Sequence, residues 1–235
     1  RINTIDINFD ARGAAPPIVW VHGAGSGLGF GFRNYDALAL LGGGAPRRVL
    51  GVDWLGAAGS SRPPYPYGGA LRRPAWTLPE AAQVDAAIAF AVESLEAWRA
   101  ALGIEQFDLV AHSLGGYLAT HYAMRHPRRV RRLVLVSPVG WTPKPAGASA
   151  AGGLVGALWG AGFANFGTLR LLGRRAERAA KRAIADRLNL HDATERTLVA
   201  RYFWSSLTAH RASAEVAVTY LLEPHSAVVA DGQFA

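Results

Sequence analysis

The spacing of apolar positions divides residues 1–139 into strands and helices. Alternating apolar and polar residues predict a half-exposed strand over residues 2–9. Short apolar runs predict strands over 18–21, 48–52, 107–111 and 130–136. Helical patterns lie between these runs, over 32–41, over 79–102 and directly after the strand that ends at residue 111. Strands that alternate with helices predict an α/β fold, in which helices cover both faces of a mostly parallel sheet.

Beyond Pro138 the alternation stops. Residues 141–167 are rich in proline, glycine and aromatic residues, and two helical patterns follow over 168–190 and 194–222. This change predicts a helical cap or lid rather than a second complete domain. The expected units are a core over 1–139, a cap over 140–225 and the start of a return to the core over 226–235.

One uncharged stretch, residues 152–169, nearly reaches the length of a membrane span. Its glycines and Asn165 favour a cap segment or a segment at a membrane surface, with insertion as the weaker alternative. The chain begins with Arg1 and shows no cationic, apolar leader, so we expect a processed start or a fragment. The expected location is intracellular, in the cytoplasm or peripheral to a membrane, with the mitochondrion and the lipid droplet as candidate organelles.

Composition narrows the function classes. The 235 residues are 50% hydrophobic, which is enough to bury a core, and the absence of cysteine excludes disulfides and thiolate metal sites. The net charge of +8 comes mainly from arginine, because Lys144 and Lys181 are the only lysines. No recognition module accompanies this charge, so nucleic acid is not an expected partner. No metal site or cofactor is predicted.

The most informative motif surrounds Ser113. The strand over 107–111 runs through His112 into Ser113-Leu114-Gly115-Gly116, and a helical pattern follows. This layout is typical of a nucleophile elbow, in which a strained strand-to-helix turn exposes the serine hydroxyl. The usual pattern is Gly-x-Ser-x-Gly; here Ala111 replaces the first glycine and Gly115 keeps the second. A Ser-Leu-Gly-Gly turn without chemical function is the alternative.

A second motif, His22-Gly23-Ala24-Gly25, follows the strand over 18–21. The backbone N–H groups of Ala24 and Leu114 would together form an oxyanion hole for acyl transfer. The alternatives are a simple glycine-rich turn or a phosphate cradle. His22 and the later elbow favour the oxyanion interpretation.

These motifs, with the run Asp53-x-x-Gly56-x-x-Gly59-Ser60-Ser61, resemble the α/β-hydrolase family over nearly the whole chain. Residues 25–30, 53–63, 96–103 and 136–141 are similar to the branch that contains the lipid-droplet lipase coactivator, N-acylphosphatidylethanolamine lipase and fungal cardiolipin phospholipases. The resemblance implies lysophospholipase, phospholipase or lysophosphatidic acid acyltransferase activity, with Ser113 as the nucleophile. It also implies structural support of the site by His22, Gly23, Gly115 and Asp53.

The remaining members of a catalytic triad are not evident. The fold normally places an acid and then a histidine on loops after later strands, and no such strands follow the cap. The acyltransferase motif His-x-x-x-x-Asp is also absent. We therefore expect the catalytic acid and base to lie outside this chain. His112 is expected to point into the sheet packing, and Asp53 is expected to brace a turn rather than serve as the acid.

A cationic stripe marks the cap. Arg170, Arg174, Arg178 and Arg182 recur every four residues and would share one helical face. Such a face is suited to anionic lipid at a membrane or droplet surface, although a solvated helix face is an equal alternative. The sequence thus predicts a serine hydrolase or acyltransferase of lipid acyl esters, with a phospholipid or lysophospholipid substrate. The alternative hypothesis is a non-catalytic module that binds lipid or regulates a lipase.

Overall fold

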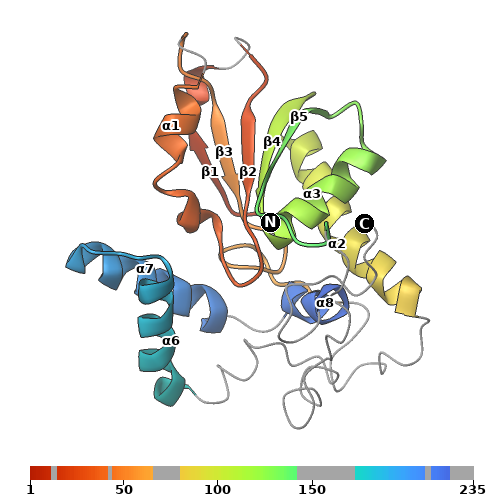
Figure 1. The fold of residues 1–235 in the computed structure, drawn as a ribbon. Coiled ribbons are helices and arrows are strands. Elements are labelled where there is room, and N and C mark those ends of the chain that lie inside the picture. The colour runs from red at the N-terminus through yellow and green to blue at the C-terminus, as the bar shows by residue number, and fades with distance from the viewer. Residues whose placement is uncertain (12–14, 42–43, 66–79, 142–172, 210–212, 223–235) are drawn as a thin grey trace.

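The computed structural model describes residues 1–11, 15–41, 44–65, 80–141, 173–209 and 213–222 (Figure 1). Five strands form one sheet in the order β1-β3-β2-β4-β5. The strands are β1 (Thr4–Ile7), β2 (Ile18–Val21), β3 (Val49–Val52), β4 (Phe107–His112) and β5 (Val130–Val136). Only β1 runs antiparallel to its neighbour, so the predicted mostly parallel sheet is confirmed.

The central strand β2 is buried on both faces, which explains its unbroken apolar sequence. Ile18 and Trp20 pack on one face with the short helix α1 (Tyr35–Ala39). Val19 and Val21 pack on the other face, in a larger core that includes α2 (Glu80–Ala101) and α3 (Leu114–Arg125). Helices therefore lie on both sides of the sheet (Figure 1).

Helix α2 buries apolar side chains that recur at helical spacing along one of its faces. Each of these residues is less than 9% exposed: Val84, Ile88, Ala91, Val92, Leu95 and Trp98. The helix is joined to α3 by a hydrogen bond from the Tyr122 hydroxyl to the Glu96 carboxylate at 2.6 Å. Glu96 also binds Arg99, and this guanidinium holds the pKa of the Glu96 carboxyl at about 2.

Three helices follow β5 in the described part of the chain, and we refer to them as the cap: α6 (Arg174–Arg187), α7 (Ala193–Thr208) and α8 (Ala214–Leu221). Helix α6 packs on α7, and α8 packs on α2 of the core. The helical pattern over 194–222 thus gives two helices instead of one continuous helix. The stretch 152–169 lies outside the described residues. No helix in the described part of the chain is long and apolar enough to cross a membrane.

Two further elements differ from the expected ones. The helix predicted over 32–41 is limited to α1, and a 3₁₀ turn, η2 (Leu28–Gly31), precedes it. Residues 32–34 form turns, and Asn34 and Leu40 cap the shorter helix at its two ends. At the other edge of the sheet, β5 pairs only with β4 among the described strands and leaves Val134 47% and Val136 43% exposed.

Candidate active site

Ser113 forms the turn between β4 and α3. Its backbone angles are φ 55° and ψ −124°, a region that costs a residue with a side chain about 1–3 kcal/mol. The Ser113 N–H donates to the Val136 carbonyl at 3.0 Å, and its own carbonyl accepts from Gly116 and Val139. The end of β5 and the loop after it therefore hold the strained turn in place. This is the geometry expected of a nucleophile elbow.

Glycines let two chain segments meet at this turn. A Cβ added to Gly23 would stand 2.8 Å from the Ser113 Cβ and 3.2 Å from its Oγ. A Cβ added to Gly115 would stand 2.4 Å from the His22 carbonyl oxygen. The loop that follows β2 is thereby pressed against the start of α3. No residue larger than glycine fits at either contact without a backbone shift.

His22 lies beneath the elbow and is 2% exposed. Its Nε2 accepts a hydrogen bond from the Trp54 N–H at 3.2 Å, so the ring proton is assigned to Nδ1, which donates to the Gly23 carbonyl at 2.8 Å. Burial lowers the pKa of His22, and the nearby Asp53 carboxylate only partly opposes this effect. His22 is therefore neutral. Its separation of 3.6 Å from Asp53 is a contact and not an ion pair, because Nε2 carries no proton.

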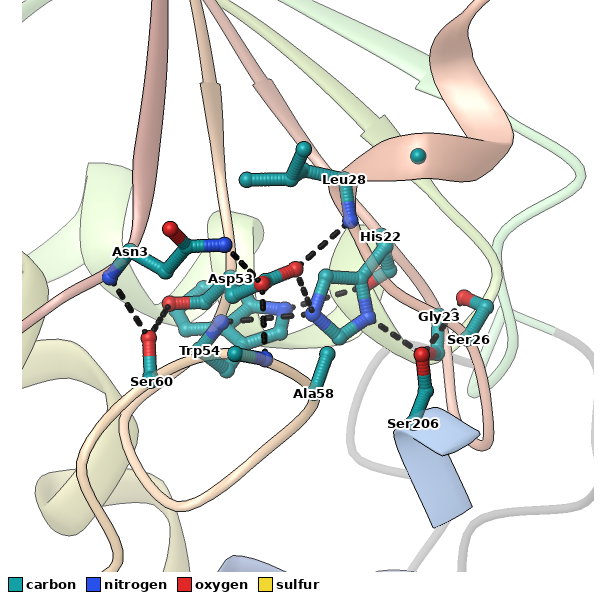
Figure 2. A network of polar contacts seen from close by, with 12 residues as sticks. Asn3, His22, Gly23, Ser26, Leu28, Asp53, Trp54, Ala58, Ser60 and Ser206 are labelled. Carbon is teal, nitrogen blue, oxygen red and sulfur yellow. Dashed lines mark hydrogen bonds and ion pairs between the residues drawn. The ribbon is translucent and has the colours of Figure 1, made fainter. Parts of the chain in front are cut away.

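Asp53 connects separate segments of the site (Figure 2). Its carboxylate accepts from the Leu28 N–H at 2.6 Å, the Gly59 N–H at 3.0 Å and the Asn3 amide at 2.7 Å. The side chain is fully buried, and these donors compensate for the loss of water. Asp53 therefore fixes the glycine-rich loop against the loop after β3 and the N-terminal segment.

Ser113 opens onto a groove of about 900 Å³ between the sheet and the cap. Ala24 and Ser26 line it from the loop after β2, and Arg187 lines it from the end of α6. Most of its other lining residues are apolar, and they are Trp20, Phe30, Leu38, Leu41, Val110, Val134, Val136, Ile184, Leu188, Phe203, Val218 and Leu222.

A second pocket, lined mainly by apolar residues but also by His22, Arg62 and Ser206, shares Ala24 and Ser26 with this groove. Ala24 and Leu114, the predicted oxyanion residues, both line it. Alanines of α2, Leu118 of α3 and Leu207 of α7 form its apolar wall. The structure therefore brings Ser113, Ala24 and Leu114 to one place, where Ala24 lines both the groove and the pocket.

Tyr202 of α7 connects the cap to the glycine-rich segment that follows β2. Its hydroxyl accepts a hydrogen bond from the Gly29 N–H at 3.0 Å, and its ring lies 5.6 Å from that of Phe30. Burial, and secondarily the charge of Asp53, raise the pKa of Tyr202 to about 12. At the exposed end of the same helix, Glu195 pairs with Arg33 of the core.

No histidine in the described part of the chain is hydrogen-bonded to the Ser113 hydroxyl. His112 was expected to point into the sheet packing, but it is exposed and lines the groove, because it is the last residue of β4 and the sheet ends there. Partial burial, with the charge of Arg187 as a smaller cause, lowers its pKa. Both ring nitrogens of His22 are already hydrogen-bonded, to the Gly23 carbonyl and the Trp54 N–H. The described residues thus assemble an elbow without a triad.

The predicted cationic stripe is described only in part. Arg170 and the side chain of Arg174 lie outside the described residues, whereas Arg178 and Arg182 are exposed on α6. Two site residues were missed from the sequence, Tyr202 and Arg187. Both come from the cap, and nothing in the local sequence distinguishes them from other tyrosines and arginines. Glycines at 27 and 29 were the available signal for a close contact, although not for its partner.

Comparison with known proteins agrees with this geometry. Residues 16–206 match the family model described as alpha/beta hydrolase fold. A 1-acylglycerol-3-phosphate O-acyltransferase of Arabidopsis thaliana is 32% identical in an alignment of 235 positions. The alignment covers 94% of this chain and 51% of the relative. The (lyso)-N-acylphosphatidylethanolamine lipase of Homo sapiens is 38% identical over 133 residues, 57% of this chain and 33% of the relative. The chain thus spans about half the length, or less, of these curated relatives.

Solved structures show the same fold. An esterase from Exiguobacterium antarcticum superposes with a TM-score of 0.55 at 17% identity, covering 93% of this chain and 67% of that one. An epoxide hydrolase from Bacillus megaterium superposes with a TM-score of 0.61 at 13% identity, covering 96% of this chain and 70% of that one. With the family match over residues 16–206, these likenesses establish that the chain belongs to the α/β-hydrolase fold family.

Proposed function

We propose that the protein is a serine-dependent hydrolase or acyltransferase of lipid acyl esters. The observation that carries the proposal is Ser113 at positive φ between β4 and α3, with Gly23 against it and Ala24 on the same groove. The mainly apolar pocket beside Ala24 and Leu114, of about 70 Å³, would take the first carbons of an acyl chain. The relatives named for 1-acylglycerol 3-phosphate and N-acylphosphatidylethanolamine support a phospholipid or lysophospholipid substrate.

In this proposal the Ser113 Oγ bonds to the ester carbonyl carbon while its proton passes to a histidine. The carbonyl oxygen becomes an oxyanion that accepts hydrogen bonds from the Ala24 and Leu114 N–H groups. The bond to the leaving alcohol breaks, and the alcohol takes the proton from the histidine. Water then attacks the acyl-enzyme to release a carboxylic acid, or a lysophospholipid hydroxyl attacks it to form a new ester.

We assign the histidine and its acid to sequence outside this chain. Among the described histidines, His22 is neutral and occupied, and His112 has no hydrogen bond to Ser113. Exposed Arg178 and Arg182 of α6 would contact anionic lipid at a membrane or droplet surface. In this way the enzyme would act while peripherally attached.

The full-length protein is the material for the test. A fluorophosphonate probe should label the wild type, and Ser113→Ala should abolish the labelling. Ser205→Ala is the matched comparison, because Ser205 is exposed on α7 and does not line the groove. Labelling that survives in Ser113→Ala would remove Ser113 from the nucleophile role.

The second candidate is a non-catalytic module that binds lipid or regulates a lipase. It is favoured by the elbow without a triad among the described residues. Flotation with liposomes that contain cardiolipin or phosphatidic acid, beside an esterase assay, separates the two candidates. Flotation of the full-length protein without turnover or labelling would favour the module.

A further inference from the structure

Arg187 is the last residue of α6, and its exposed side chain lines the groove onto which Ser113 opens. Among the described residues that line this groove, Arg187 is the one cation, because the lowered pKa of His112 keeps that side chain neutral at pH 7. The surrounding lining is largely aliphatic and aromatic. A positive charge is thus placed in the space where a substrate of Ser113 would lie.

Several cations near Arg187 are held in ion pairs, whereas Arg187 is not. Lys181 binds Glu177 at 2.5 Å, Arg196 binds Asp186 at 2.9 Å, and Arg33 binds Glu195 across the cap and core. Within the described residues, Arg187 makes no ion pair or hydrogen bond through its side chain. Asp186, its sequence neighbour, is already engaged by Arg196. The guanidinium of Arg187 therefore has its donors available for a ligand.

The two spaces beside Ser113 differ in polarity. The pocket beside Ala24 and Leu114 is lined mainly by apolar residues, and its cation, Arg62, already donates to the Ala58 and Ser206 carbonyls. Its space of about 70 Å³ therefore suits a short hydrocarbon segment. The groove carries Arg187, whose planar guanidinium is suited to bidentate binding of phosphate. An ester that has an acyl chain at one end and a phosphate at the other would match both spaces, with its carbonyl at Ser113.

We propose that Arg187 binds the phosphate of the substrate headgroup and so selects anionic glycerolipid esters over neutral ones. The inference rests on the proposed function, because it places the substrate on Ser113. It assigns a specificity residue that is separate from the cationic stripe of Arg178 and Arg182. Those two residues do not line the groove.

The test measures binding, which does not require turnover. Calorimetry on the full-length protein would compare three ligands: the octyl ether of glycerol phosphate, the octyl ether of glycerol, and glycerol phosphate without a chain. Ethers offer no carbonyl for Ser113 to attack. Charge-assisted hydrogen bonds are strong, so Arg187→Ala should weaken the octyl ether of glycerol phosphate by about tenfold or more. Affinity for the neutral octyl ether should change by less than about twofold, and Arg187→Lys should recover part of the loss.

Arg201→Ala is the matched control, because Arg201 is exposed on α7 and does not line the groove. It removes the same charge and should leave all three affinities unchanged. Equal weakening of both octyl ethers by Arg187→Ala, or no weakening, would overturn the inference. Glycerol phosphate that binds as tightly as its octyl ether would also overturn it, since the ligand would then be a free phosphate ester. Failure of the proposed function is seen separately, as labelling that Ser113→Ala does not remove.

Discussion

The hydroxyl of Tyr202 occupies the space in which a side chain on Gly27 would begin. A Cβ built on Gly27 would stand 2.2 Å from that hydroxyl and 2.7 Å from the Ala58 Cβ. The absence of a side chain at Gly27 therefore leaves room for a cap residue 175 positions away in the sequence. Because Ala24 lies in the same loop, we expect the packing of Tyr202 to influence the position of the Ala24 N–H, the predicted oxyanion donor.

Gly27→Ala should destabilise the protein, because the new methyl group has to displace Tyr202 or Ala58. Overpacking of this kind costs about 1–3 kcal/mol. Gly44→Ala is the control, since no atom lies within 4 Å of the Cβ position at Gly44. Denaturant unfolding of Gly27→Ala in the wild-type and Tyr202→Phe backgrounds would measure the coupling. Gly27→Ala should lose less stability in the Tyr202→Phe background, which lacks the hydroxyl. Strictly additive effects of the two substitutions would contradict the contact between Gly27 and Tyr202.

Tyr202→Phe should change the response of stability to alkaline pH. The pKa of Tyr202 is about 12 in the folded protein, above the usual value of 10.0. The folded state therefore favours the protonated phenol, and this contribution is complete below pH 10 and is lost as pH rises toward 12. Between these values the wild type should lose more stability than Tyr202→Phe, which cannot ionise there. Parallel unfolding curves over this range would show that the hydroxyl is not buried as described.

His22 should make the protein sensitive to acid. Its lowered pKa means that the unfolded chain binds a proton below about pH 6.5 while the folded protein does not, so stability falls as pH falls through that window. His22→Gln retains an acceptor for the Trp54 N–H but does not titrate. Thermal unfolding from pH 7 to pH 5 should show a smaller acid loss in the variant. His112→Gln serves as the comparison, because His112 also has a lowered pKa but is partly exposed.

Asp53→Asn separates a structural carboxylate from a catalytic one. In the variant, the side-chain NH₂ group would face at least one of the N–H donors of Leu28, Gly59 and Asn3, and that hydrogen bond would be lost. We therefore expect stability to fall by about 2–4 kcal/mol. The remaining folded protein should still be labelled by a fluorophosphonate at Ser113. If Asp53 were the triad acid, the rate of labelling would instead fall by orders of magnitude with little change in stability.

Leu207→Ala should shift the preferred acyl chain length. Leu207 reaches the apolar pocket from α7, outside the sheet core, so its truncation enlarges the pocket. The ratio of kcat/KM for dodecanoyl over butanoyl nitrophenyl esters should rise several-fold in the full-length enzyme. Leu198→Ala on the same helix is the control, because Leu198 is 59% exposed. An equal rise in both variants would mean that the pocket does not hold the chain.

The sequence predicted those parts of the site that depend on residues close to one another in the chain. Strand β4, the small residues around Ser113 and the His22-Gly23 loop lie at the carboxyl ends of adjacent parallel strands, and the sheet brings them together. Tyr202 and Arg187 could not be predicted in this way. Their roles arise from how α6 and α7 pack on the core, and packing between distant segments leaves no periodic signal. His112 was misjudged because its exposure depends on where the sheet ends.

The outer position of β5 bears on any measurement made with this chain. Among the described strands it pairs on one side only, and Val134 and Val136 are exposed. Unpaired strand edges with β-branched side chains can join those of other molecules. Samples of the isolated chain should therefore be examined by light scattering over a dilution series before kinetics are interpreted. Reversible self-association would otherwise imitate a dependence of specific activity on enzyme concentration.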